Sequence, residues 1–104
     1  MFGRKNINTW LEEYRQTEDA VLLDVRSREE YEQGHIPGSV RLDVQEIRFA
    51  DEVIPDLDTP VFLYCLSGAR SGRAAAALQQ MGYENAVSIG GITAYKGELA
   101  FGDE

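Results

Sequence analysis

The central unit of the predicted fold is VFLYCLSGARSGRAAAALQQ, residues 61–80. Residues 61–64 are apolar throughout, which predicts a strand buried on both faces. The small residues of LSGARSG follow Cys65, and four alanines with Leu78 then predict a helix that stops at Gly82. The sequence therefore predicts a strand, a loop and a helix in immediate succession, with the single cysteine where the strand ends.

Outward from this unit, short apolar runs alternate with segments of helical character. Further strands are expected at residues 21–25, 40–42 and 85–89, and helices at 10–16, 28–33, 43–50 and 92–99. This alternation is typical of an α/β domain with a largely parallel sheet. The last residues, AFGDE, are expected to be loose.

Two segments have the spacing of a helix capping box. Thr9 is followed by Glu12, and Ser27 is followed by Glu30. In such a box the side chain of the first residue accepts a hydrogen bond from the backbone N–H three residues later. The acidic side chain at that later position accepts a hydrogen bond from the backbone N–H of the first residue. We therefore expect one helix to begin at Thr9 and another at Ser27, the second ending near Gly34.

Composition limits the classes of function. A chain of 104 residues fits one compact domain, residues 1–104. Its net charge of −8 repels nucleic acids and anionic membranes. No apolar run approaches the roughly 20 residues of a membrane helix. One cysteine excludes an intrachain disulfide, and no apolar run starts the chain, so a cytoplasmic location is expected.

Cys65 is the candidate catalytic residue. In parallel α/β sheets, ligands bind at the carboxyl ends of strands. Backbone N–H groups of the following loop and the start of the next helix favour a thiolate there. The charges of Arg70 and Arg73 are expected to add to this effect and to hold an anionic substrate. The alternative is an inert, buried cysteine. The expected substrate-binding residues are Leu66, Ser67, Gly68, Ala69, Arg70 and Ser71.

These motifs resemble those of the rhodanese-domain sulfurtransferases. The string YCLSGARS at 64–71 is similar to the active-site loop of that family. LLDVRSREEYEQGHIPGSV at 22–40 resembles its N-terminal signature, and VSIGGITAYKG at 87–97 its last strand and glycine turn. Three motifs in the family's order, covering about residues 22–97, make the resemblance specific.

The resemblance implies a fold and a reaction. The fold is a central parallel five-stranded sheet flanked by helices on both faces. In the reaction, the Cys65 thiolate takes the outer sulfur of thiosulfate or a persulfide and passes it to cyanide or a thiol. The family needs no metal or organic cofactor. The resemblance also places Asp24 and Arg26 near the loop, where they support it or simply close a turn.

Three alternatives remain open. Phosphatases with a similar fold have one residue more between cysteine and arginine, whereas only four separate Cys65 from Arg70. A persulfide carrier would exchange sulfur with proteins or small thiols, and would use thiosulfate poorly. A regulatory or binding module would lack catalysis. His35, the only histidine, belongs to the Gly-His-Ile-Pro-Gly segment, which is structural in the family.

Overall fold

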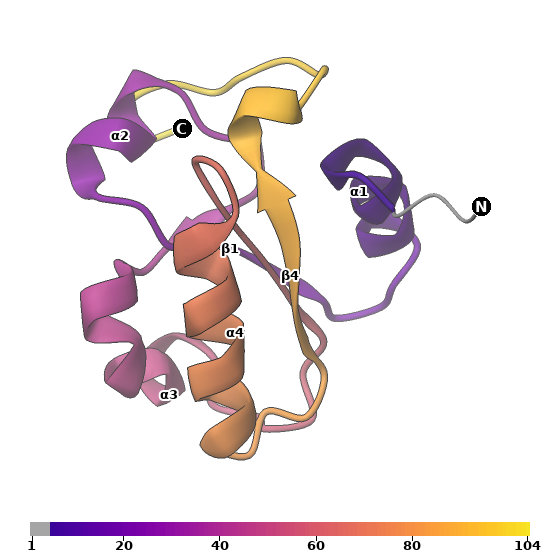
Figure 1. Ribbon diagram of the computed structural model, residues 1–104, viewed down its shortest axis with the longest axis vertical. Coiled ribbons are helices and arrows are strands. Elements are labelled where there is room, and N and C mark those ends of the chain that lie inside the picture. The colour runs from indigo at the N-terminus through magenta and orange to yellow at the C-terminus, as the bar shows by residue number, and fades with distance from the viewer. Residues whose placement is uncertain (1–4) are drawn as a thin grey trace.

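The computed structural model describes residues 5–104, so the first four residues of the predicted domain lie outside the described part. Its centre is a parallel sheet with the strand order β2-β1-β3-β4 (Figure 1). The strands are β1 (Val21–Asp24), β2 (Val40–Arg41), β3 (Val61–Cys65) and β4 (Ala86–Gly91). The α/β class and the parallel arrangement are as expected from the sequence.

The expected number of strands is wrong: residues 5–104 form four, not five. The fifth strand was implied by the family resemblance alone, since only four apolar runs in this chain have the character of a strand. Near the carboxyl end the chain makes a single antiparallel bridge, between His35 and Ala100, instead of extending the sheet.

Helices cover both faces of the sheet (Figure 1). The helical elements are α1 (Ile7–Arg15), α2 (Arg28–Gln33), the 3-10 helix η1 (Val44–Phe49), α3 (Ala50–Val53), α4 (Ala69–Gln80) and the 3-10 turn η2 (Ile92–Ala94). One core contains residues of α4, α3 and the strands, and the other packs α1 against the opposite face. Both faces of β3 are consequently buried along its whole length.

Two helix predictions are corrected. The first helix begins earlier than expected, because the side chain of Asn6 accepts from the N–H groups of Asn8 and Thr9 at 2.9 and 3.1 Å. Thr9 therefore lies inside the helix. The expected final helix shrinks to η2, after which Tyr95 has extended backbone. The capping box at Ser27 is confirmed.

The carboxyl-terminal tail is not loose as expected. Ala100 is buried and exchanges two backbone hydrogen bonds with His35, at 2.8 and 2.9 Å. The segment around His35 is in turn tied to β3, because the Tyr64 hydroxyl accepts from the N–H of Ile36 at 3.0 Å. These contacts hold the Gly-His-Ile-Pro-Gly segment in place, in agreement with the structural role expected for His35.

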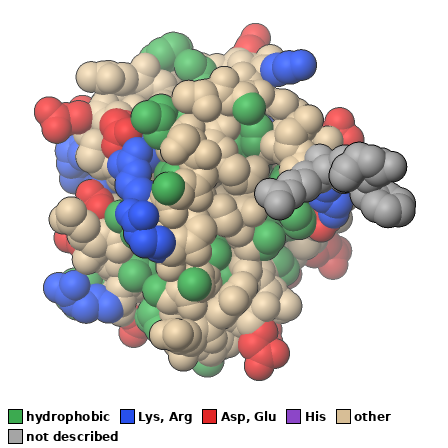
Figure 2. All heavy atoms as spheres, viewed as in Figure 1, with side chains coloured by type: hydrophobic (Ala, Val, Ile, Leu, Met, Phe, Trp, Pro, Cys, Tyr) green, Lys and Arg blue, Asp and Glu red, His purple; other side chains and the backbone are tan. Residues whose placement is uncertain are grey.

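Acidic side chains are dispersed on one face of the protein (Figure 2). Figure 2 shows acidic groups around the outline of this face, not gathered in one patch. No helix formed by residues 5–104 has the length and apolar character that crossing a bilayer requires.

Candidate active site

The Cys65 sulfur lies at the carboxyl end of β3, inside a ring of donors. The N–H of Gly68 donates to it at 3.0 Å, and the N–H of Ser71 at 3.4 Å. The Ser71 hydroxyl lies 3.5 Å from the same sulfur. Cys65 has no solvent-exposed surface, so these groups enclose the sulfur. We call this ring of donors from Ser67, Gly68 and Ser71 the sulfur cradle.

The sulfur cradle favours the thiolate. Burial raises the pKa of Cys65, but hydrogen bonds from the Ser71 hydroxyl and from the N–H groups of Ser71, Gly68 and Ser67 outweigh it and hold the pKa below the ordinary value of a thiol. The pKa of Cys65 is thus lowered, as the sequence predicts. Hydrogen bonds contribute more to this shift than the charges of Arg70 and Arg73.

The turn after Cys65 depends on Gly68, which has φ +113° and stands at the N-terminus of α4. A left-handed residue here lets the chain reverse so that successive N–H groups face the sulfur. The helix that follows adds the positive end of its dipole. Helix α4 begins at Ala69, within the small-residue segment after Cys65, which brings the first helical turn to the sulfur.

The far side of the loop rests on the end of β4. Thr93 donates to the carbonyl of Leu66 through both its N–H and its hydroxyl, each at 3.3 Å. In a trans peptide the N–H points opposite to the carbonyl, so this contact turns the N–H of Ser67 toward the sulfur. A side chain at Gly91 would overlap the Leu66 carbonyl and Ser67, and glycine is therefore required for this close approach.

The Ser71 hydroxyl anchors the cradle from inside. It lies 2.7 Å from the Ser88 hydroxyl on β4 and 3.1 Å from the Gly68 carbonyl oxygen. Ser71 is completely buried, and these partners determine its position. The contact therefore fixes the start of α4 relative to the sheet.

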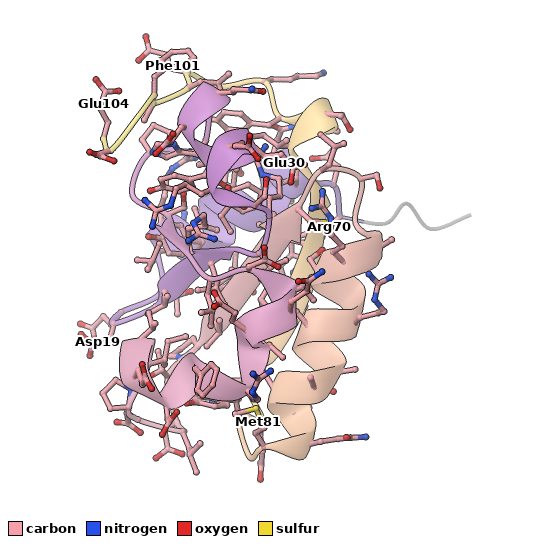
Figure 3. The ribbon with its side chains drawn as sticks, turned by 90° about the vertical axis from the view of Figure 1, so that its left-hand side faces the viewer. Asp19, Glu30, Arg70, Met81, Phe101 and Glu104 are labelled. Atoms are coloured by element: carbon pink, nitrogen blue, oxygen red, sulfur yellow. The ribbon has the colours of Figure 1, made fainter. Side chains whose placement is uncertain are left out.

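Arg70 leaves the loop and pairs with Glu30 of α2 (Figure 3). Two parallel hydrogen bonds of 2.8 and 2.9 Å join the guanidinium to both carboxylate oxygens. The Arg70 bonds lower the pKa of Glu30 to about 2, against the effect of burial, and bonds from Ser27 assist. The Glu30–Arg70 pair is thus ionised at neutral pH.

Asp24 and Arg26 form a second, buried ion pair. The guanidinium contacts the carboxylate at 2.8 to 3.2 Å, and also donates to the Gly34 carbonyl at 2.8 Å. Both side chains are at most 5% exposed. The pair ties the end of β1 to the end of α2, and within the described contacts it does not hydrogen-bond the Cys65 loop. A supporting role of this pair at the Cys65 loop stays a prediction.

The other predicted residues are arranged around the loop in different ways. Leu66 and Ala69 are exposed on its outside, and the side chain of Arg73 is exposed on α4 with no hydrogen bond or ion pair to another of residues 5–104. Sequence analysis missed four contacts, those of Glu30, Ser88, Gly91 and Thr93. Glu30 was interpreted only as a helix cap, since nothing local indicates a partner 40 positions away.

A cavity of about 470 Å³ opens beside the loop. Its apolar wall includes Leu66, Ile92 and Leu99. Arg26 and Glu30 lie at its polar side, where each is already bonded to an oppositely charged partner. The cavity therefore adjoins the site through Leu66.

A parallel α/β sheet whose inner strand ends in a cysteine within a ring of backbone donors defines a class of domains that stabilise a reactive sulfur. Comparisons with known proteins identify the family within this class. The model of the family described as "Rhodanese-like domain" matches residues 8–98. The chain belongs to the rhodanese-like family of single-domain sulfurtransferases.

Curated relatives agree with this assignment. The chain is 42% identical over 80 residues to a sulfurtransferase of Allochromatium vinosum, covering 76% of this chain and 74% of that protein. It is 38% identical over 92 residues to the thiosulfate sulfurtransferase GlpE of Pseudomonas entomophila, with 83% of each chain covered. The thiosulfate sulfurtransferase PspE of Escherichia coli is 38% identical over 72 residues, with 67% of this chain and 68% of that protein covered.

Solved structures show the same fold. An Escherichia coli rhodanese with anions superposes with a TM-score of 0.75 at 30% identity, covering 80% of this chain and 99% of that one. A human single-domain sulfurtransferase gives a TM-score of 0.71 at 27% identity, covering 86% and 91%.

Proposed function

We propose that this protein transfers sulfane sulfur through a persulfide on Cys65, with thiosulfate or a persulfide as donor and cyanide or a thiol as acceptor. The observation that carries the proposal is the sulfur cradle. The N–H groups of Gly68 and Ser71 donate to the sulfur, and together with the Ser71 hydroxyl and the N–H of Ser67 they lower its pKa. An enclosed thiolate with such donors is a nucleophile stabilised for attack on sulfur.

Two balanced displacements make up the reaction. In the first, the Cys65 thiolate attacks the outer sulfur of thiosulfate, the S–S bond breaks, and sulfite leaves with the bonding electrons. The products are the ionised Cys65 persulfide and sulfite. In the second, cyanide attacks the outer sulfur of the persulfide, thiocyanate leaves, and the thiolate is restored. No proton or external oxidant is needed in either step.

The cradle serves both states of the cysteine. In the free protein its donors stabilise the thiolate, and in the intermediate they face the negative outer sulfur. Because Cys65 is enclosed in this structure, exchange of sulfur requires the exposed side chains of Leu66 and Ser67 to move aside, while the Leu66 carbonyl keeps its bonds to Thr93. The rest of the loop is anchored by Ser71 and need not move.

The phosphatase alternative has less support. A phosphate needs a free guanidinium above the cysteine, whereas that of Arg70 is bonded to Glu30 through both of its terminal nitrogens. The loop also has one residue fewer than the phosphatase pattern. A non-catalytic module is not favoured either, since it would have no use for a cradle that lowers the pKa of Cys65.

Intact-mass measurement tests the proposal. Incubation with thiosulfate should add the mass of one sulfur atom, and cyanide should remove it with formation of thiocyanate. Cys65→Ser, or alkylation of the single cysteine beforehand, should abolish both events. Full thiocyanate production by the Cys65→Ser variant would show that the proposal is wrong.

A further inference from the structure

Helix α1 lies beside the turn that follows β4 and is joined to it by one side chain, that of Asn8 (Figure 1). The Asn8 amide nitrogen donates to the Ala94 carbonyl at 2.9 Å, and the amide oxygen accepts from the N–H of Lys96, also at 2.9 Å. A primary amide that donates at one end and accepts at the other fixes two backbone groups at once. We call residues 92–96 the η2 turn.

Most of the η2 turn is exposed. Ile92 and Tyr95 are partly buried against the core on the α1 face of the sheet, whereas the other residues of the turn are exposed. Apolar packing is not directional, but hydrogen bonds to a carbonyl and to an N–H are. The two apolar side chains therefore hold the turn close to the sheet, and Asn8 determines how its peptide groups are rotated.

The rotation of the η2 turn affects the sulfur cradle through Thr93. The N–H and the hydroxyl of Thr93 both donate to the Leu66 carbonyl, each at 3.3 Å. This carbonyl and the N–H of Ser67 belong to one planar peptide, and that N–H is among the groups that lower the pKa of Cys65. Contacts of this length are at the long end of the range for hydrogen bonds, so a small rotation of the turn would break them.

We infer that Asn8 is a positioning residue for sulfur transfer: through the η2 turn it holds the peptide between Leu66 and Ser67 in the orientation that the sulfur cradle requires. This inference rests on the proposed function and deepens it. Within the described hydrogen bonds, Asn8 contacts neither Cys65 nor its loop, so its effect must pass through Thr93. Such supporting contacts keep a reactive group in its productive geometry.

Three single variants isolate the contact. Asn8→Ala removes both bonds to the η2 turn without weakening α1, because alanine is the better helix former. Asn8→Asp keeps the size of the side chain and the acceptor for the N–H of Lys96, but its carboxylate has no proton to donate to the Ala94 carbonyl. Thr9→Ala is the matched control, since Thr9 is exposed in the same turn of α1 and its hydroxyl contacts only Asn6 among the described residues.

The main readout is the pH dependence of Cys65 alkylation by iodoacetamide, and the second is the rate constant of persulfide formation from thiosulfate, measured by quenched intact mass. In Asn8→Ala and Asn8→Asp the alkylation profile should move to higher pH, because one amide donor to the thiolate is misplaced. Persulfide formation at neutral pH should be about fivefold slower, as expected for the loss of one hydrogen bond. Thr9→Ala should match the wild type in both measurements.

A double variant tests whether the effect passes through Thr93. Asn8→Ala should slow persulfide formation less in a Thr93→Val background than in the wild type, because the hydroxyl contact is then already lost. Thermal melting of each variant verifies that the compared proteins are folded.

Three outcomes would overturn the inference: an unmoved alkylation profile in both Asn8 variants, the same shift in Thr9→Ala, or a full effect of Asn8→Ala in the Thr93→Val background. A purely structural role of Asn8 gives the first of these, with a lower melting temperature. Failure of the proposed function has a different signature. Wild-type protein would then gain no sulfur from thiosulfate, whereas the alkylation profiles do not depend on sulfur transfer.

Discussion

Ser71 contacts the Cys65 sulfur through two separate groups, its backbone N–H at 3.4 Å and its hydroxyl at 3.5 Å. The backbone contact exists because α4 begins at Ala69, and the hydroxyl contact because Ser88 holds that side chain from β4. One residue thus couples the ionisation of the cysteine to the packing of a helix on a strand.

Ser71→Ala should raise the pKa of Cys65, because the hydroxyl donor is lost while the backbone donors remain. The pH dependence of alkylation by iodoacetamide measures this pKa. Ser88→Ala is the matched control: it removes a buried hydroxyl next to Ser71 that does not contact the sulfur, so a smaller shift is expected. Equal shifts in the two variants would contradict a direct effect of Ser71.

Gly91→Ala should lower the rate of persulfide formation at least about tenfold, since an added methyl group overlaps the Leu66 carbonyl and displaces the loop. Intact mass after incubation with thiosulfate provides the rate. Gly72→Ala on α4 is the comparison, because a methyl group there meets no atom within 4 Å. That variant should instead raise the free energy of unfolding by up to about 1 kcal/mol, through helix propensity. A fully active Gly91→Ala would argue against the close approach.

Asp24→Asn should destabilise the protein by about 3 kcal/mol or more, because it leaves the Arg26 guanidinium buried without a countercharge. Urea unfolding measures the loss. Glu32→Gln removes one partner of the exposed Arg28–Glu32 pair, whose atoms are 4.0 Å apart, and should change stability by less than about 1 kcal/mol. Similar losses in the two variants would show that burial of the Asp24–Arg26 pair is unimportant.

The pH dependence of stability should report on Glu30. Its pKa in the folded protein, about 2, lies below its ordinary value of 4.5, so the folded state binds its proton less readily than the unfolded chain. The stabilising contribution is therefore complete above pH 4.5 and disappears as the pH falls toward 2. Over this interval the wild type should lose about 1 kcal/mol more than Glu30→Gln, a value reduced for solvent screening. Parallel curves for the two proteins would disprove the contribution.

Much of the fold could be predicted from local patterns. The apolar run of residues 61–64 is typical of a strand that is buried on both faces, and the alanines that follow it favour a helix. The capping box at Ser27 is a local signal as well, and the structure confirms it. The errors fell where tertiary contacts override such signals, as at the tail, which the His35–Ala100 bridge holds to the body of the protein.

In the candidate site, too, local sequence patterns predict some features and contacts between distant residues determine the others. The position of Cys65 between a strand and a small-residue loop made it the candidate nucleophile, and the donors of the loop could be expected from its glycine and the helix start. The partner of Arg70 could not, because a cation in a sequence carries no information about which distant carboxylate will reach it. The interpretation of Glu30 as a cap was correct and incomplete, since one carboxylate performs both tasks.

The amino-acid order by itself determined the alternation of strands and helices and the placement of the single cysteine at a strand end, because these follow from side-chain periodicity and backbone propensity over a few residues. The pairing of distant charges, in contrast, depends on how the elements pack. Thr93, 27 positions after Leu66, donates to the Leu66 carbonyl and thereby orients an amide of the loop. Glu30, 40 positions before Arg70, forms an ion pair with the Arg70 guanidinium. Such convergence depends on the packing of whole elements, which no short stretch of sequence encodes.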